Sequence, residues 1–310
     1  MLTHIIEYIF TDNDLEQYAY VDLYKLFIAA TNSKCIFDIM LYTPTDAAFI
    51  HIEKGQYDIK KFNNKHFFTK KHFTLFINKI KRTYKKAMNS IFVFGGHCNG
   101  LYCYTKSNII DFSMIRDAFL KNNIHFDTIW FDSCYTATLD TIEQFYDSTN
   151  YIVSHMMYVN AEGFNSFNLC KILDTKYNFY KKLKLLALDY INRSISEKEH
   201  SSITILDCSM IKQFFTLYNT YYKQIKIIIN DKKSKKYVTD LCTKWLDSKY
   251  SCNNMLDLYS ILKILNNKEL INIFNKAVYY KTNGIKVDPK YFNPKSKFYG
   301  VNIIIDKSKQ

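Results

Sequence analysis

Two apolar runs in the sequence end abruptly, and each is followed at once by a reactive side chain. The first, SIFVFGGHCNG, leads to His97, and the second, FDTIWFDSCYTATL, leads to Cys134. Residues 113–122 between them have helical spacing. This order predicts two parallel strands whose carboxyl ends meet at one edge of a sheet, where open α/β sheets hold catalytic groups. Because neighbouring strands lie about 4.8 Å apart, we expect the imidazole and the thiol to lie within reach of each other.

The pair is interpreted as a nucleophile and its base. Residues 138–146 predict a helix after Cys134, and a thiol at a helix N-terminus has a lowered pKa. The eight Cys residues are scattered without a CxxC pair, which predicts neither a disulfide framework nor a zinc site. Cys98 and Cys103 are the alternative reactive thiols, but neither begins a helix. A lone His or Cys after a strand is usually structural, so the hypothesis depends on the matched positions of the two.

The remaining pattern predicts an α/β fold. Apolar strand-like runs alternate with helical spacing over the first half of the chain, which indicates a mainly parallel sheet with helices on both faces. After Phe164 the pattern is largely helical, with a helix expected over 255–280. A short apolar run at 201–207 interrupts it, and a last strand at 300–305 is expected to rejoin the sheet. We therefore predict a single domain over 1–310, with an α/β core at 1–165 and a helical elaboration at 166–310.

Charge and composition argue against nucleic acid and membranes as partners of this protein. The formal net charge is +13, but only 3 of the 42 basic residues are Arg, the preferred bidentate reader of phosphates and bases. This scarcity argues against nucleic acid as the partner. The N-terminus MLTHIIEYIF has no basic region or cleavage site of a signal peptide, and no apolar run approaches the roughly 20 residues of a membrane span. A soluble, cytoplasmic protein that contacts no membrane is expected.

Five segments, in order along the chain, resemble one family. They are YIFTDNDLEQYAYVDLYKL, FDTIWFDSCYTATLDTIEQFYDSTNYIVSH, SSITILDCSMI, DLYSILKIL, and KAVYYKTNG with GVNIII. Each is similar to a segment of the clostripain-type (C11) cysteine peptidases of clan CD, including the D-x-C-x-x-A-T nucleophile block. The resemblance implies a caspase-like three-layer sandwich and a cysteine endopeptidase that acts on protein or peptide substrates.

The resemblance also implies roles for individual residues. Cys134 is the expected nucleophile and His97 the general base and acid. The backbone N–H groups of Cys134 and of Cys98, the residue after the histidine, are expected to form the oxyanion hole. The family has H-G where this chain has His97-Cys98, and a non-Gly residue cannot freely take a positive φ. The departure leaves an alternative, a catalytically impaired caspase-like pseudopeptidase that acts as an interaction module.

Charge in the family's S1 pocket implies the specificity. Asp132 precedes Cys134 by two residues and points to the same side of the strand, and Glu162 lies in a turn that resembles the family's G-D-G-W. Two carboxylates there predict cleavage after Lys or Arg. Asp132 as a helix cap and Glu162 as an ordinary loop carboxylate are the alternatives. His155 is expected in the pocket wall.

The resemblance also bears on self-cleavage and on the need for a cofactor. Relatives mature by a cut between the His and Cys strands, which makes Lys106 a possible self-cleavage point. No cofactor and no metal site are expected. Some relatives need calcium, but the sequence has no loop with EF-hand spacing.

Overall fold

The computed structural model describes residues 2–11, 14–44, 47–62, 70–84, 89–100, 102–104, 109–156, 159, 161, 163–196, 202–234, 255–283 and 300–304. The strands are β1 (Thr3–Phe10), β2 (Ile36–Tyr42), β3 (Ala47–Glu53), β4 (Gln56–Lys61), β5 (Asn89–Gly95), β6 (His97–Cys98), β7 (Tyr102–Tyr104), β8 (Ile109–Asp111), β9 (Phe126–Asp132), β10 (Thr149–Ser154), β11 (Ser202–Asp207), β12 (Met255–Asp257), β13 (Val278–Asn283) and β14 (Asn302–Ile304). The helices are α1 (Glu16–Ala30), α2 (Lys70–Tyr84), α3 (Phe112–Lys121), α4 (Leu139–Phe145), α5 (Ser166–Leu173), α6 (Phe179–Ser196), α7 (Cys208–Asn230), α9 (Leu258–Leu265) and α10 (Lys268–Ala277).

The central sheet has nine strands in the order β13-β11-β10-β9-β5-β1-β2-β3-β4. Its middle strands, from β10 to β2, run parallel, and antiparallel strands extend both edges. The chain leaves β1 for β2 on one side and returns with β5 on the other. This reversal makes a topological switch point between β1 and β5, where ligands bind in open α/β sheets.

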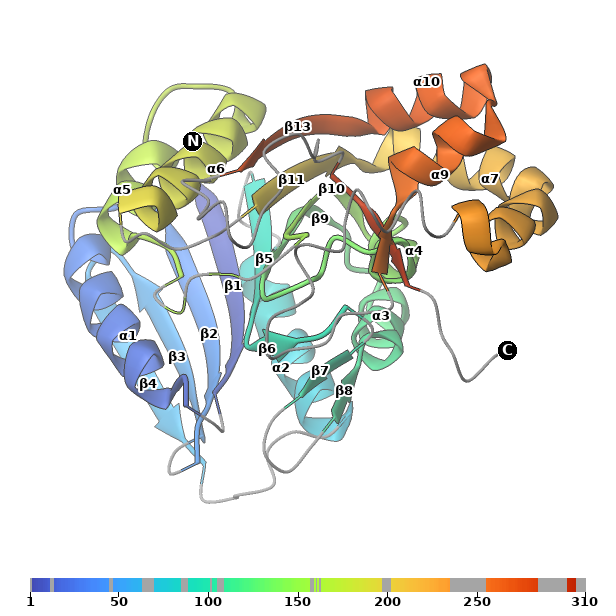
Figure 1. The fold of residues 1–310 in the computed structure, drawn as a ribbon. Helices are drawn as coiled ribbons and strands as arrows, with labels where there is room; N and C mark the ends of the chain where they lie inside the picture. The colour runs from blue at the N-terminus through green and yellow to red at the C-terminus, as the bar shows by residue number, and fades with distance from the viewer. Residues whose placement is uncertain are drawn as a thin grey trace.

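Helices cover both faces of the sheet, which gives three layers (Figure 1). Helices α1, α5 and α6 bury their apolar sides on one face, while α2, α3, α4, α7, α9 and α10 bury theirs on the other. Because both faces are covered, the central strands are apolar almost throughout, and β2 is buried at every position. The structure thus confirms the caspase-like architecture with a mainly parallel sheet and helices on both faces.

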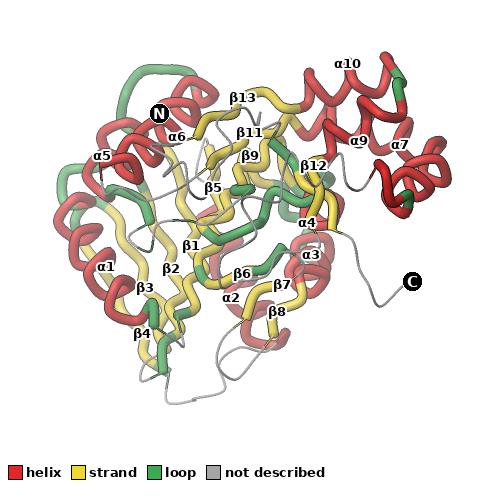
Figure 2. Tube along the Cα trace, in the orientation of Figure 1, coloured by secondary structure: helices red, strands yellow, loops and turns green. Residues whose placement is uncertain are grey.

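The second half of the chain departs from the prediction in its strand pairing. β14 forms where a last strand was expected, but it pairs with β12 in a separate antiparallel ribbon and does not rejoin the central sheet (Figure 2). The helix expected over 255–280 is divided into β12, α9, α10 and the start of β13, and β13 adds to the sheet beside β11. An apolar run indicates a strand but not its partner, because pairing is decided by tertiary contacts.

A second small sheet lies between the two strands that lead to His97 and Cys134. Strands β6, β7 and β8 pair antiparallel in sequence order. β7 and β8 are not predictable from the sequence, because each has only three residues and neither alternates clearly. This sheet holds His97 beyond the end of β5.

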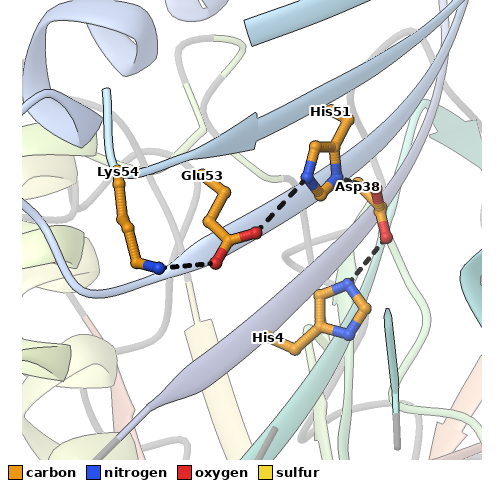
Figure 3. A network of polar contacts seen from close by, with 5 residues as sticks. All are labelled: His4, Asp38, His51, Glu53 and Lys54. Atoms are coloured by element: carbon orange, nitrogen blue, oxygen red, sulfur yellow. Dashed lines mark hydrogen bonds and ion pairs between the residues drawn. The ribbon is translucent and has the colours of Figure 1, made fainter. Parts of the chain in front are cut away.

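A buried polar network lies near the amino-terminal ends of β1 and β2, on the face covered by α2. The Asp38 carboxylate contacts His4 Nε2 at 2.9 Å and His51 Nδ1 at 2.7 Å, and Glu53 and Lys54 continue the chain of contacts (Figure 3). His4 and Asp38 are essentially inaccessible to solvent. Each therefore depends on the other for its hydrogen bond, since a buried polar group without a partner is costly.

We expect Asp38→Asn to lower the free energy of unfolding by about 2 kcal/mol. An amide cannot accept from both imidazoles, so one buried donor is left unsatisfied. Urea unfolding followed by circular dichroism measures the change, with Asp58→Asn on the exposed strand β4 as the matched control. An equal change in both variants would show that the network does not stabilise the fold.

Candidate active site

A cavity of about 970 Å³ opens at the carboxyl edge of the central sheet, at the switch point between β1 and β5. Residues of β1, β5 and α1 line it together with the loops that follow β9 and β10. The polar side chains in its lining include Glu7, Asp14, Asp22, Asn99, His97, Asp132 and Cys134. The structure therefore brings His97 and Cys134 to one cavity, as the order of strands predicted.

His97 begins β6, just past the end of β5, and the imidazole has two contacts. Its Nε2 lies 2.8 Å from Oδ1 of Asp14, which precedes α1, and its ring stacks on Tyr104 of β7 at 5.7 Å between centroids. With Asp14 as acceptor, the Nε2 atom carries the proton and the Nδ1 lone pair is left to accept another. Asp14 was not among the residues predicted for the site, although it belongs to the polar sequence Thr11-Asp12-Asn13-Asp14 that follows the first apolar run.

Cys134 lies in the loop after β9 and is partly exposed. Its Sγ accepts a hydrogen bond from the Val159 N–H at 3.4 Å. The next residue, Tyr135, has φ +57°, a left-handed conformation that is costly for a non-Gly residue and is typical of functional sites. The loop after β9 is thus held in a strained turn at the cavity.

Cys134 was expected at the N-terminus of the following helix, but the structure does not place it there. Helix α4 begins at Leu139, and the side chain of Thr138 caps it by accepting from the Thr141 N–H at 3.2 Å. The hydroxyls of Thr138 and Thr141 also donate to the Gly100 carbonyl, at 2.8 and 2.9 Å. These bonds connect the end of the loop that carries Cys134 to the hairpin that carries His97.

Cys98 was considered as an alternative reactive thiol and as a possible source of backbone strain, and the structure shows neither. It forms a disulfide with Cys103 across the β6–β7 pair, so neither is a free thiol and neither remains an alternative to Cys134. The scattered cysteines predicted no disulfide framework, and this single bridge was not foreseen. Cys98 is also not among the residues with a positive φ, which in this hairpin is taken by Gly100 at +93°. The replacement of Gly by Cys after the histidine therefore causes no backbone strain.

Asp132 is the last residue of β9 and lines the same cavity. The Tyr190 hydroxyl of α6 donates to its Oδ1 at 2.6 Å. A Cβ placed on Gly163, whose φ is +57°, would lie 2.6 Å from its Oδ2, so only glycine fits there. Burial raises the pKa of Asp132 to about 6, while the Tyr190 hydrogen bond and the Arg193 charge oppose the rise. The alternative role as a helix cap does not hold, because Thr138 caps α4.

Two further carboxylates, neither of them predicted from the sequence, line the cavity. Glu7 of β1 has a pKa raised to about 8, mainly by burial and then by the charges of Asp132 and Asp22. Asp22 of α1 has a pKa raised to about 7, again mainly by burial. The sequence does contain an indication of Glu7, because it is the one acidic residue in the run THIIEYIF. Alternation along a strand places its side chain on the same face as those of Ile5 and Ile9.

Of the other residues predicted from the sequence, two lie outside the described part of the chain and one, His155, is described but does not line the cavity. Glu162 and Lys106 lie outside the described residues, although Ala161 and Gly163 on either side of Glu162 line the cavity. His155 is fully buried and hydrogen-bonded through Nδ1 to the Ser202 carbonyl at 2.6 Å, and it is not among the lining residues. Burial lowers its pKa to about 4.

The fold corresponds to that of a known class of enzymes. The chain has the caspase-like fold of the C11, clostripain-type cysteine proteases. A secreted C11 cysteine protease from Bacteroides thetaiotaomicron, whose crystal structure contains an irreversible peptide inhibitor, is 16% identical, with 98% of this chain and 93% of that chain covered and a TM-score of 0.73. An inactive zymogen C11 protease from Parabacteroides distasonis is 18% identical, with coverage of 98% and 92% and a TM-score of 0.69.

The similarity to known proteins is found in the structure and not by comparison of sequences. No protein-family model matches the chain, and no curated protein matches it significantly in sequence. Among the described residues, no group of three or more His, Cys, Asp or Glu side chains could hold a metal ion. None of the helices in the same part of the chain is long and apolar enough to cross a membrane.

Proposed function

We propose that the protein is a cysteine endopeptidase in which Cys134 is the nucleophile and His97 the general base and acid. The observation that carries the proposal is the common location of His97, Cys134 and Asp132, which line one cavity at the carboxyl edge of the sheet. The fold shared with C11 cysteine proteases supports it. The substrate is a protein or peptide, and one similar protease was crystallised with a peptide inhibitor.

The reaction proceeds in two halves. His97 takes the thiol proton while Cys134 Sγ attacks the scissile carbonyl carbon, and the resulting oxyanion is held by the backbone N–H groups of Cys98 and Cys134. The C–N bond then breaks as the imidazolium returns the proton to the leaving amine, which leaves a thioester. In the second half His97 deprotonates a water molecule, which attacks the thioester, and the thiol leaves with the proton.

A basic P1 residue is the specificity that the charges favour. Asp132 lines the cavity close to Cys134 in sequence, and Glu162 remains proposed as a second acidic residue of this pocket. A carboxylate pair would bind the cationic end of Lys or Arg through charge-assisted hydrogen bonds. Self-cleavage after Lys106 stays a prediction, as does the absence of a cofactor, and the calcium dependence of turnover is measured in the assay below.

The proposal is tested by hydrolysis of fluorogenic peptides that differ only at P1, with Arg, Lys, Asp or Asn there. We expect turnover after Arg and Lys in wild-type protein and none in Cys134→Ala protein, because the nucleophile is removed. The assay is run with and without calcium. Turnover only after Asp or Asn would keep the nucleophile and overturn the basic pocket. Silence across the panel in folded protein would favour the pseudopeptidase, which the strain-free backbone at Cys98 does not itself support.

Asp14 is expected to act as a positioning residue for His97. Asp14→Asn should lower kcat about 10-fold with little change in KM, because a neutral amide oxygen holds the Nε2–H less tightly than the carboxylate and stabilises the imidazolium less. The effect is modest because Asp14 is 81% exposed and water can replace it. Asp58→Asn, an exposed carboxylate outside the cavity, is the control. A rise in KM with unchanged kcat would mean that Asp14 binds substrate instead.

The cytoplasmic location predicted from the N-terminal residues stays a prediction. Disulfides such as Cys98–Cys103 persist in oxidising compartments, and one of the similar proteases is described as secreted. Both observations favour an oxidising compartment over the cytoplasm.

A further inference from the structure

The carboxylate of Glu7 is buried without a partner. Glu7 is 8% exposed, and among the described residues no hydrogen-bond donor or cation contacts its side chain. It lies in β1 on the face covered by α1, and it lines the cavity. A buried ionisable group without a partner is costly, so a glutamate at this position requires a reason.

The two neighbouring carboxylates already have partners. Asp132 accepts from Tyr190 and lies near the charge of Arg193, and Asp22 has an ion pair with Lys25 at 3.9 Å. The Arg193 guanidinium itself donates to the Gly163 carbonyl at 3.2 Å. Glu7 is therefore the acceptor in this group for which the described residues supply no cation.

The strand register places Glu7 at the inner end of the cavity. Ile9 of β1 pairs with Gly95 of β5, and Gly95 pairs with Asp132 of β9, so these three lie at one level across the sheet. Glu7 precedes Ile9 by two residues, which puts it about 6.6 Å further from the carboxyl edge. The cavity thus extends from Cys134 past Asp132 toward Glu7.

The walls of this inner part are suited to an aliphatic stem. They are lined by Leu23 and Leu26 of α1, Val93 of β5 and Leu169 of α5. An apolar passage that ends in an unpaired carboxylate is complementary to a long basic side chain, whose methylenes lie along the walls while the charged end reaches the acceptor.

We propose that Glu7 is a specificity-determining residue, the terminal acceptor for the cationic end of an extended basic P1 side chain. The inference rests on the proposed peptidase function and adds to it a residue and a length requirement. Lys and Arg reach Glu7, whereas the shorter ornithine ends nearer to Asp132. Bound substrate supplies the positive charge that no described residue supplies to Glu7.

The test compares wild-type protein with Glu7→Gln, using peptide substrates that carry Lys, ornithine or norleucine at P1. We expect kcat/KM for Lys to fall about 10- to 100-fold in the variant, chiefly through KM, because one charge-assisted hydrogen bond is lost. Turnover of the norleucine substrate is expected to stay the same or rise, and ornithine is expected to lose less than Lys. Glu143→Gln, an exposed carboxylate on α4, is the matched control.

A binding measurement separates this inference from the proposed function. Titration of Nα-acetyl-lysine amide into Cys134→Ala protein, followed by NMR, is repeated in the Glu7→Gln background after thermal unfolding has shown both to be folded. Loss of binding with Glu7→Gln supports the inference even if no substrate is cleaved. An unchanged Lys-to-norleucine ratio in Glu7→Gln, or absence of binding while Glu7 is intact, overturns it.

Discussion

Replacing His97 with alanine is expected to lower kcat for the preferred basic substrate by about 10³-fold, within the range that a general acid–base group contributes. Without the imidazole the thiol loses its proton only to water, and the leaving amine loses its proton donor. The side chain is 28% exposed and contacts mainly Asp14 and Tyr104, so the unfolding midpoint should change little. Steady-state kinetics and thermal unfolding of the same preparations measure both effects.

A matched histidine provides the control for His97. His125 precedes β9 at the opposite edge of the sheet and contacts Asn150 at 3.0 Å. His125→Ala should keep full activity, and added imidazole should restore part of the activity of His97→Ala protein alone. Equal losses in the two variants would point to a general effect of histidine removal. Full activity in His97→Ala protein would require another base.

The sequence could predict the sheet edge at which His97 and Cys134 lie, because that edge follows from local patterns and one topological rule. Two apolar runs separated by a helix give parallel strands, and the carboxyl ends of parallel strands lie at the same edge. His97 and Cys134 each follow such an end, so their common cavity needed no knowledge of the rest of the fold. Asp132 followed for the same reason, since it is the last residue of β9 and lies at the same edge.

The parts that could not be predicted depend on pairings between distant segments. Glu7 and Asp22 meet Asp132 only because α1 covers one face of the sheet while α2, α3 and α4 cover the other, and no local pattern shows which face a helix will choose. β14 pairs with β12 for reasons of the same kind. The Cys98–Cys103 disulfide depends on the short β6–β7 hairpin, which periodicity cannot detect in strands of two or three residues.

We expect the free energy of unfolding to fall as the pH rises from about 6.5 to 8.5, and to fall less in Glu7→Gln protein. Burial raises the pKa of Glu7 to about 8 in the fold, against an ordinary value of 4.5. The folded state therefore keeps a proton that the unfolded chain has already lost, and stability decreases with pH until the folded group also ionises. Each unit of pKa difference corresponds to about 1.4 kcal/mol, so Glu7→Gln protein should be the more stable of the two at pH 8.5.

The difference between the two proteins isolates Glu7 from the other titrating groups. Asp22 and Asp132 also have raised pKa values, of about 7 and 6, and they destabilise the fold in the same direction. His155 has a lowered pKa of about 4, so its effect on the free energy of unfolding becomes more favourable as the pH rises and no longer changes above about pH 7. Both proteins contain these groups, and only the coupling of the two aspartates to Glu7 changes. The free energy of unfolding is measured with urea at pH 6.5, 7.5 and 8.5 for both proteins. If it changes with pH in parallel in the two, the Glu7 carboxylate is not held protonated in the fold. A steeper fall in wild-type protein, reduced by Nα-acetyl-lysine amide, would show that a bound cation offsets the cost of ionising it.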